Sequence, residues 1–157
     1  MESFFARKVH KGFKKALFSD YILKRIKEVI DSILSNNPDY KILVTGHSLG
    51  GALSVLCGIH LSSQRPATDI TVENFGCPRV GNDHFRNWVN EIPNLSIWRF
   101  VFDDDLVTRL PPAVLWYRHV GHLIHLGKDI KVYYLQDGCR SLNYISAPKE
   151  PWDSKLY

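Results

Sequence analysis

Residues 40–56, YKILVTGHSLGGALSVL, constrain the fold of this chain more than any other stretch. An apolar run, KILVT (41–45), stops at Gly46, and a serine follows two residues later. A short apolar run that ends at a glycine is typical of a buried strand. From Ser48 to about Ser62 the apolar residues follow helical spacing over most of the circumference, which predicts a buried helix.

The alternation of strand and helix continues along the chain. We expect strands over 70–76 and 96–102, with a helix over 82–92 between them, and an amphipathic helix over 20–36 before the first strand. The segments 119–126 and 130–136 predict a late antiparallel hairpin. Strands that alternate with helices indicate a mostly parallel sheet flanked by helices, so the fold class is α/β and residues 1–157 form one domain.

Gly46-His47-Ser48-Leu49-Gly50 has the pattern G-x-S-x-G between a strand and a helix. In such an elbow the serine takes an unfavourable backbone conformation, so that its hydroxyl stands clear of the sheet. We expect Gly46 and Gly50 to crowd together where a Cβ would clash. The Leu49 N–H, at the start of the helix, is the predicted oxyanion donor. His47 is interpreted as a structural histidine that points away from the serine.

Ser48 is therefore the predicted nucleophile. The alternative is a serine that only caps a buried helix, which is common. Capping explains Ser48 but neither Gly46 nor the pair Gly50 and Gly51, because glycines in the first turn destabilise a helix.

A serine nucleophile needs a histidine base and an acid that orients the base. Three adjacent acids, Asp103, Asp104 and Asp105, follow the strand over 96–102. The acid is expected at the end of a later strand, and the other two aspartates are expected to be solvated.

Five segments, in order, resemble motifs of the class 3 (fungal-type) lipase family of α/β-hydrolases. They are VHKGF (9–13), YKILVTGHSLGGALSVL (40–56), ENFGCPRVGN (73–82), RFVFDDDLVTRLPP (99–112) and YRHVGH (117–122). The resemblance implies an α/β-hydrolase fold and places the catalytic acid on Asp105. Phe102 and Thr108 depart from the family, which usually has Asn and Pro there. Structural roles are implied for Cys77, Pro78, Arg79 and Gly81, and His119 matches a strand histidine that does not catalyse.

The family's second oxyanion donor and its lid belong upstream of VHKGF, and its general-base histidine belongs well downstream of Asp105. No histidine follows His125, so no general base is assigned, although His119, His122 and His125 keep the order of serine, acid, histidine. KILVT is apolar on both faces, which suits a central strand covered on each side. We therefore expect the central part of a larger domain, incomplete at both ends.

The predicted function is a serine ester hydrolase that acts on acylglycerols or related acyl lipids through an acyl-serine on Ser48, with Asp105 orienting the base. Transient contact with a lipid interface is expected. One alternative is a catalytically incomplete lipase-like fragment that binds acyl chains or a partner. Even where the full-length protein is an enzyme, we expect the 157-residue chain to have little or no esterase activity. Another is an esterase that acts on small soluble esters, thioesters or peptides.

The net charge of +4 is modest, and the basic cluster ARKVHKGFKK (6–15) is interpreted as a solvated face rather than a nucleic-acid site. No run reaches the roughly 18 apolar residues of a membrane span. The first residues show no secretory signal pattern, although a missing N-terminus would remove one, so the compartment stays open.

The sequence predicts no metal site and no cofactor. Cys57, Cys77 and Cys139 cannot all pair within one chain and are expected to be free thiols. His119 and His125 would share one face of a strand while His122 takes the other, so they would not form a one-sided metal cluster.

Overall fold

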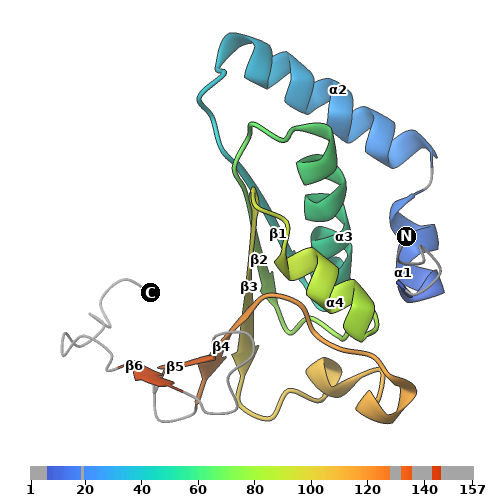
Figure 1. Ribbon diagram of the computed structural model, residues 1–157, viewed down its shortest axis with the longest axis vertical. Coiled ribbons are helices and arrows are strands. Elements are labelled where there is room, and N and C mark those ends of the chain that lie inside the picture. The colour runs from blue at the N-terminus through green and yellow to red at the C-terminus, as the bar shows by residue number, and fades with distance from the viewer. Residues whose placement is uncertain (1–6, 19, 128–131, 136–142, 146–157) are drawn as a thin grey trace, which may run out of the picture.

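The structure is a computed structural model that describes residues 7–18, 20–127, 132–135 and 143–145. Between residues 20 and 102 its helices and strands alternate as the sequence predicts (Figure 1). The helices are α1 Lys11–Leu17, α2 Asp20–Asn36, α3 Leu49–Gln64 and α4 Asp83–Asn90, with short 3-10 helices η2 Leu106–Arg109 and η3 Ala113–Leu115. The strands are β1 Ile42–His47, β2 Ile70–Phe75, β3 Leu95–Phe102, β4 His122–Leu126, β5 Val132–Leu135 and β6 Asn143–Ile145.

The strands form one sheet in the order β1-β2-β3-β4-β5-β6. The first four run parallel, whereas β4–β5 and β5–β6 pair antiparallel, which confirms the predicted parallel sheet and late hairpin. The strand expected over 119–126 is shorter, because β4 begins only at His122. Gly121 has a left-handed φ of 73° directly before it, so His119 lies in the approach to the strand.

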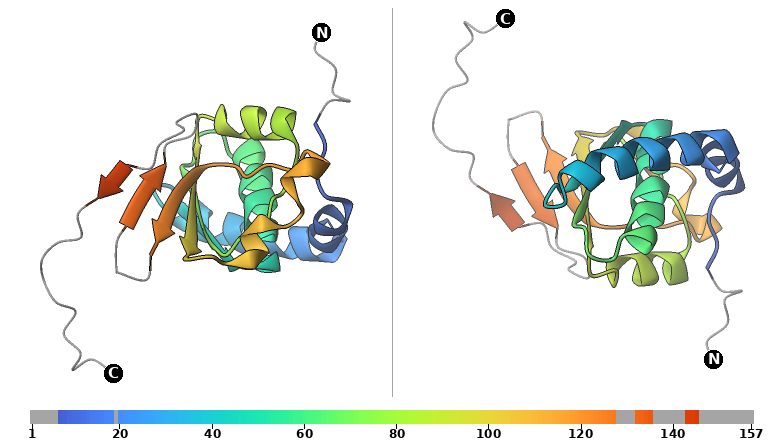
Figure 2. Two further views of the ribbon diagram at one scale, coloured as in Figure 1. Left: turned by 90° about the horizontal axis from the view of Figure 1, so that it is seen from below. Right: turned by 90° about the horizontal axis from the view of Figure 1, so that it is seen from above.

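Helices α1 to α4 all lie on one side of the sheet (Figures 1 and 2). On that side Val72 and Ile97 stand in register with Val44 and are buried. Burial of such aliphatic side chains is worth about 1.5–3 kcal/mol each. Gly58 lets α3 approach the sheet closely, since a Cβ on Gly58 would lie 2.4 Å from Cγ2 of Val72.

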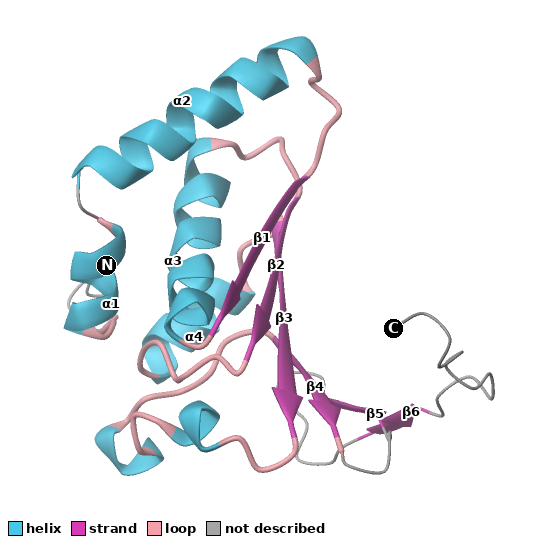
Figure 3. Cartoon of the chain, turned by 180° about the vertical axis from the view of Figure 1, so that it is seen from behind, coloured by secondary structure: helices cyan, strands magenta, loops and turns pink. Residues whose placement is uncertain are grey.

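The opposite face of the sheet has no helix over it in the described part of the chain (Figure 3). Leu43 on β1 is 60% exposed, and Phe102 on β3 is exposed as well. Among the described residues β1 is thus an edge strand with one uncovered face, as expected if further parts of the domain cover it. The reason is that every described helix packs on one side of the sheet.

Candidate active site

Ser48 stands in the sharp turn between β1 and α3. Its backbone has φ 53° and ψ −121°, a conformation that costs of order 1–3 kcal/mol for a residue other than glycine. The Ser48 side chain makes no capping hydrogen bond to α3. The capping alternative therefore does not account for this serine, and the strained elbow does.

The two glycines of the elbow differ in the space that surrounds them. A Cβ on Gly46 would lie 2.2 Å from the carbonyl oxygen of Gly50, so position 46 admits only glycine. A Cβ on Gly50 would meet nothing within 4 Å. The expectation of mutual crowding is thus wrong for Gly50, because its carbonyl rather than its α-carbon faces Gly46. The second close approach falls on Gly51, whose Cβ would lie 3.0 Å from that of Cys77.

The oxyanion donor assigned to Leu49 has the position that the role needs. Leu49 is the first residue of α3, and the N–H groups of a first helical turn have no acceptor within the helix. The helix dipole adds partial positive charge at this end. The assignment of Leu49 stays a prediction.

Asp105 lies beside the same strand end as Ser48. The Ser48 N–H donates to the carbonyl of Phe75, the last residue of β2, over 2.9 Å. Gly76 follows, and a Cβ there would lie 2.7 Å from Oδ2 of Asp105. The carboxyl end of β2 therefore brings the predicted nucleophile and the predicted acid together.

The other carboxylate oxygen of Asp105 fixes the turn that carries it. Oδ1 accepts a hydrogen bond from the Val107 N–H over 2.9 Å, and Asp105 thereby caps η2. Asp104 forms an ion pair with Arg109 and has a side chain that is 82% exposed, as expected of a solvated aspartate. Asp103 takes a left-handed φ of 44° and donates its N–H to the Leu126 carbonyl.

His47, interpreted from the sequence as a structural histidine, lies directly before the elbow serine. It is the exposed last residue of β1. Its Nε2 would lie 3.6 Å from a Cβ on Gly76, so the ring borders the same space as the Asp105 carboxylate.

Two of the three late histidines contact the loop that carries Asp105, residues 103–111, which we call the acid loop. Nε2 of His119 lies 2.9 Å from the carbonyl oxygen of Thr108, and Nε2 of His125 lies 3.0 Å from that of Asp103. A carbonyl only accepts, so each Nε2–H is the donor. The ring of the third, His122, lies 4.9 Å from that of Trp98. These contacts give His119 and His125 supporting roles.

Burial lowers the pKa of His119 well below 6.5, and the nearby charges of Arg99 and Arg79 lower it further. The imidazole therefore stays neutral under the acid loop. A neutral ring donates through Nε2 and leaves Nδ1 unprotonated, and that Nδ1 is buried without a hydrogen-bond partner.

Sequence reasoning missed the support that Thr108 gives to the acid loop, and it gave Arg79 a structural role without its partners. Thr108, a departure from the family pattern, donates its hydroxyl to the Asp105 carbonyl over 2.7 Å. Arg79 donates to the carbonyls of Arg109 and Pro111 from its guanidinium and to that of Leu110 from its backbone. The segment CPRVGN thus holds the acid loop as well as packing beside the elbow. An arginine between two buried apolar residues was the available signal.

No group of three or more histidine, cysteine, aspartate or glutamate side chains gathers as a metal site among the described residues. Cys57 and Cys77 are free and buried, and burial raises the pKa of the Cys77 thiol to about 12. Cys139 lies outside the described residues. No helix in the described ranges has both the length and the apolar character needed to cross a membrane.

The family model for class 3 lipases matches residues 1–115. The chain belongs to the class 3 lipase family. It is 38% identical over 111 residues to a secreted mono- and diacylglycerol lipase of Fusarium solani, an alignment that covers 71% of this chain and 32% of that protein. The chain thus spans about a third of the length of the curated lipases it matches.

Solved lipase structures share the fold. Lipase II from Rhizopus niveus superposes with a TM-score of 0.76 at 30% identity, over 88% of this chain and 52% of that one. A triacylglycerol lipase whose catalytic centre is a serine protease triad superposes with a TM-score of 0.72 at 32% identity, over 77% and 46%. The α/β-hydrolase fold expected from the five motifs is confirmed.

Proposed function

We propose that the protein containing this chain is a serine ester hydrolase that acts on acylglycerols or related acyl lipids. The observation that carries the proposal is the strained backbone of Ser48, whose side chain makes no capping hydrogen bond. Ser48 lies near Gly76, and the Asp105 carboxylate lies against Gly76. A serine held in this conformation points its hydroxyl away from the sheet, where a substrate carbonyl can reach it.

In this reaction Oγ of Ser48 attacks the ester carbonyl while a histidine accepts the hydroxyl proton. The negative oxygen of the tetrahedral intermediate is held by the Leu49 N–H, and Asp105 orients and stabilises the imidazolium. The imidazolium returns its proton to the departing alcohol, which leaves an acyl-serine. Water, deprotonated by the same histidine, then releases the carboxylic acid. The general-base histidine is not assigned among the described residues.

An exposed apolar rim beside Asp105 supports contact with a lipid surface. Leu106 is 70% exposed, Val114 80% and Trp116 72%, all within η2, η3 and the residue that follows. Exposed apolar patches mark interaction surfaces. We therefore infer that these side chains contact the lipid interface.

The same proposal includes residues 1–157 as the central part of one larger domain. Among the described strands β1 pairs only with β2, and its Leu43 is exposed. A free apolar strand edge is a surface that complete domains normally cover.

The test compares an emulsified diacylglycerol with a short-chain soluble ester, using the full-length protein and its Ser48→Ala variant as the blank. Faster release of acid from the emulsion supports a lipase. Turnover of the soluble ester alone supports the small-ester alternative. A thioester and a peptide substrate complete the panel, and no Ser48-dependent turnover of any of the four, in a folded protein, would leave only the binding-module alternative.

A further inference from the structure

The basic cluster near the N-terminus lines a cavity of about 910 Å³. The cavity lies between residues 7–18, the second half of α3, and α4. Arg7, Lys8, Lys11 and Lys14 contribute four cationic side chains to its lining. The expected solvated face therefore also forms part of the lining of a cavity.

Apolar side chains from two helices also line the cavity. They are Leu56 and Ile59 from α3, beside the polar His60 and Ser63, and Phe85 and Trp88 from α4. The guanidinium of Arg7 lies 4.5 Å from the centre of the Trp88 ring, which places a cation against an aromatic face. The lining thus combines cationic and apolar side chains.

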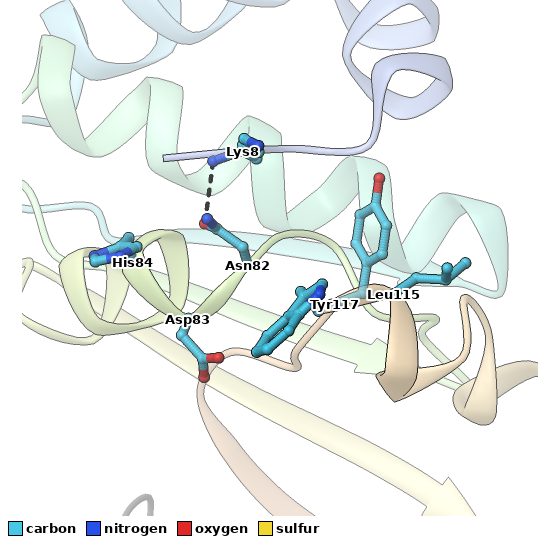
Figure 4. Close-up of a pocket in the computed structure, with 7 residues that line it drawn as sticks. Lys8, Asn82, Asp83, His84, Leu115 and Tyr117 are labelled. Atoms are coloured by element: carbon cyan, nitrogen blue, oxygen red, sulfur yellow. Dashed lines mark hydrogen bonds between the residues drawn. The ribbon is translucent and has the colours of Figure 1, made fainter. Parts of the chain in front are cut away.

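Hydrogen bonds fix the basic segment to Val80 and Asn82, just before α4. The Asn82 side chain caps α4 by accepting from the Phe85 N–H over 3.0 Å, and it also accepts from the Lys8 N–H over 3.1 Å (Figure 4). The Asn82 N–H returns a bond to the Lys8 carbonyl, and the His10 N–H donates to that of Val80. The cations are therefore carried by an anchored segment.

The three lysines of this lining have no acidic partner in the described part of the chain. Among the described residues no aspartate or glutamate lines the cavity, and Lys8, Lys11 and Lys14 form no ion pair. On α2, by contrast, Lys27 pairs with Asp31. A hollow lined by charges of one sign beside low-dielectric walls concentrates a potential that attracts the opposite charge.

We propose that this cavity binds an amphiphilic anion, an acyl chain that ends in a carboxylate or another anionic head group. The volume lies within the range of small-molecule sites, about 300–1,000 Å³. The acyl chain would contact the apolar side chains from α3 and α4, and the head group would contact the lysines. Ile59 lies roughly 16 Å along α3 from Ser48, given the rise of about 1.5 Å per residue, so this site is separate from the elbow.

The experiment titrates the full-length protein with monomeric dodecanoate in a calorimeter, with 1-dodecanol as the uncharged ligand. The charge variant is Lys11→Gln with Lys14→Gln. The matched control is Lys15→Gln with Lys24→Gln, which removes the same charge from exposed positions that do not line the cavity. A third variant, Ile59→Trp, fills the apolar part of the lining and keeps every charge. Circular dichroism checks that each variant is folded.

We expect the charge variant to weaken dodecanoate binding about tenfold and the control to change it less than about twofold. Ile59→Trp should abolish binding, and added salt should weaken it. Equal weakening by both double variants, equal binding of dodecanol, or no binding by folded wild-type chain would overturn the proposal. So would binding only to phosphatidylglycerol vesicles, since the cations would then contact a membrane surface and not a ligand in the cavity. Dodecanoate is no ester, so none of these results requires turnover at Ser48, and the cavity variants distinguish binding here from binding of a product at the elbow.

Discussion

The Asp105 carboxylate lies directly over Gly76, so that a Cβ on this glycine would approach Oδ2 to 2.7 Å. Gly76 also has a left-handed φ of 58°. Phe75, the last residue of β2, directly precedes Gly76, and its carbonyl accepts a hydrogen bond from the Ser48 N–H. One strand end thus sets the position of both predicted catalytic side chains.

Gly76→Ala should therefore lower ester hydrolysis by the full-length protein about a hundredfold, because a displacement of about 1 Å at a catalytic group has such an effect. An alanine in the left-handed conformation of residue 76 should also destabilise the fold by about 1–2 kcal/mol. Initial rates and urea unfolding measure the two effects. Gly50→Ala is the matched control, since its Cβ meets nothing within 4 Å, and it should retain activity. A Gly76→Ala enzyme with full activity would place the acid elsewhere.

Ser48→Ala should abolish labelling by a fluorophosphonate, which reacts with activated serines. Turnover of the full-length protein should fall by about 10⁶, as it does when the nucleophile of a triad is lost. Mass spectrometry of the labelled peptide identifies the modified residue. Labelling that persists in the folded variant contradicts the assignment.

Asp105→Asn should lower turnover about 10⁴-fold, because an amide no longer holds the base in the correct tautomer. Asp104→Asn changes a side chain that is 82% exposed and should have an effect below about tenfold, as surface changes do. The measurement is kcat for both variants at one pH. Equal losses at the two positions would mean that the aspartates act together.

His119 should make stability depend on pH. Its pKa in the folded protein lies well below 6.5, so only the unfolded chain takes up the proton as the pH falls through about 6.5. The stabilising contribution is thus complete above that pH and is lost below it, at no more than about 1.4 kcal/mol per pH unit.

His119→Gln keeps a donor for the Thr108 carbonyl but does not titrate. Urea unfolding should show a destabilisation by this variant that is larger at pH 7.5 than at pH 5.5. A difference between variant and wild type that stays constant over this range would show that His119 does not remain neutral in the fold.

Much of the fold was predictable from residue patterns. The helix expected over 20–36 has the bounds of α2, and the strands after it fall where the apolar runs lie. The pattern of Gly46 and Ser48 predicted the strained turn. A G-x-S-x-G motif between a strand and a helix requires a glycine at the tight position and a serine in an unfavourable backbone conformation. Helix α1 was not predicted, since its seven residues are too few to show a clear period.

Residue patterns alone were enough to predict the parallel strands and the elbow around Ser48, because these follow from short-range periodicity and from turns that only certain residues allow. Contacts in the folded chain were needed to show that Gly76 and not Gly50 is the tight position beside Asp105. The same holds for the contacts of His119 and His125 with the acid loop, and for the cavity that the basic residues line. Each of these depends on contacts between segments far apart in the chain, and local residue patterns carry no information about such distances.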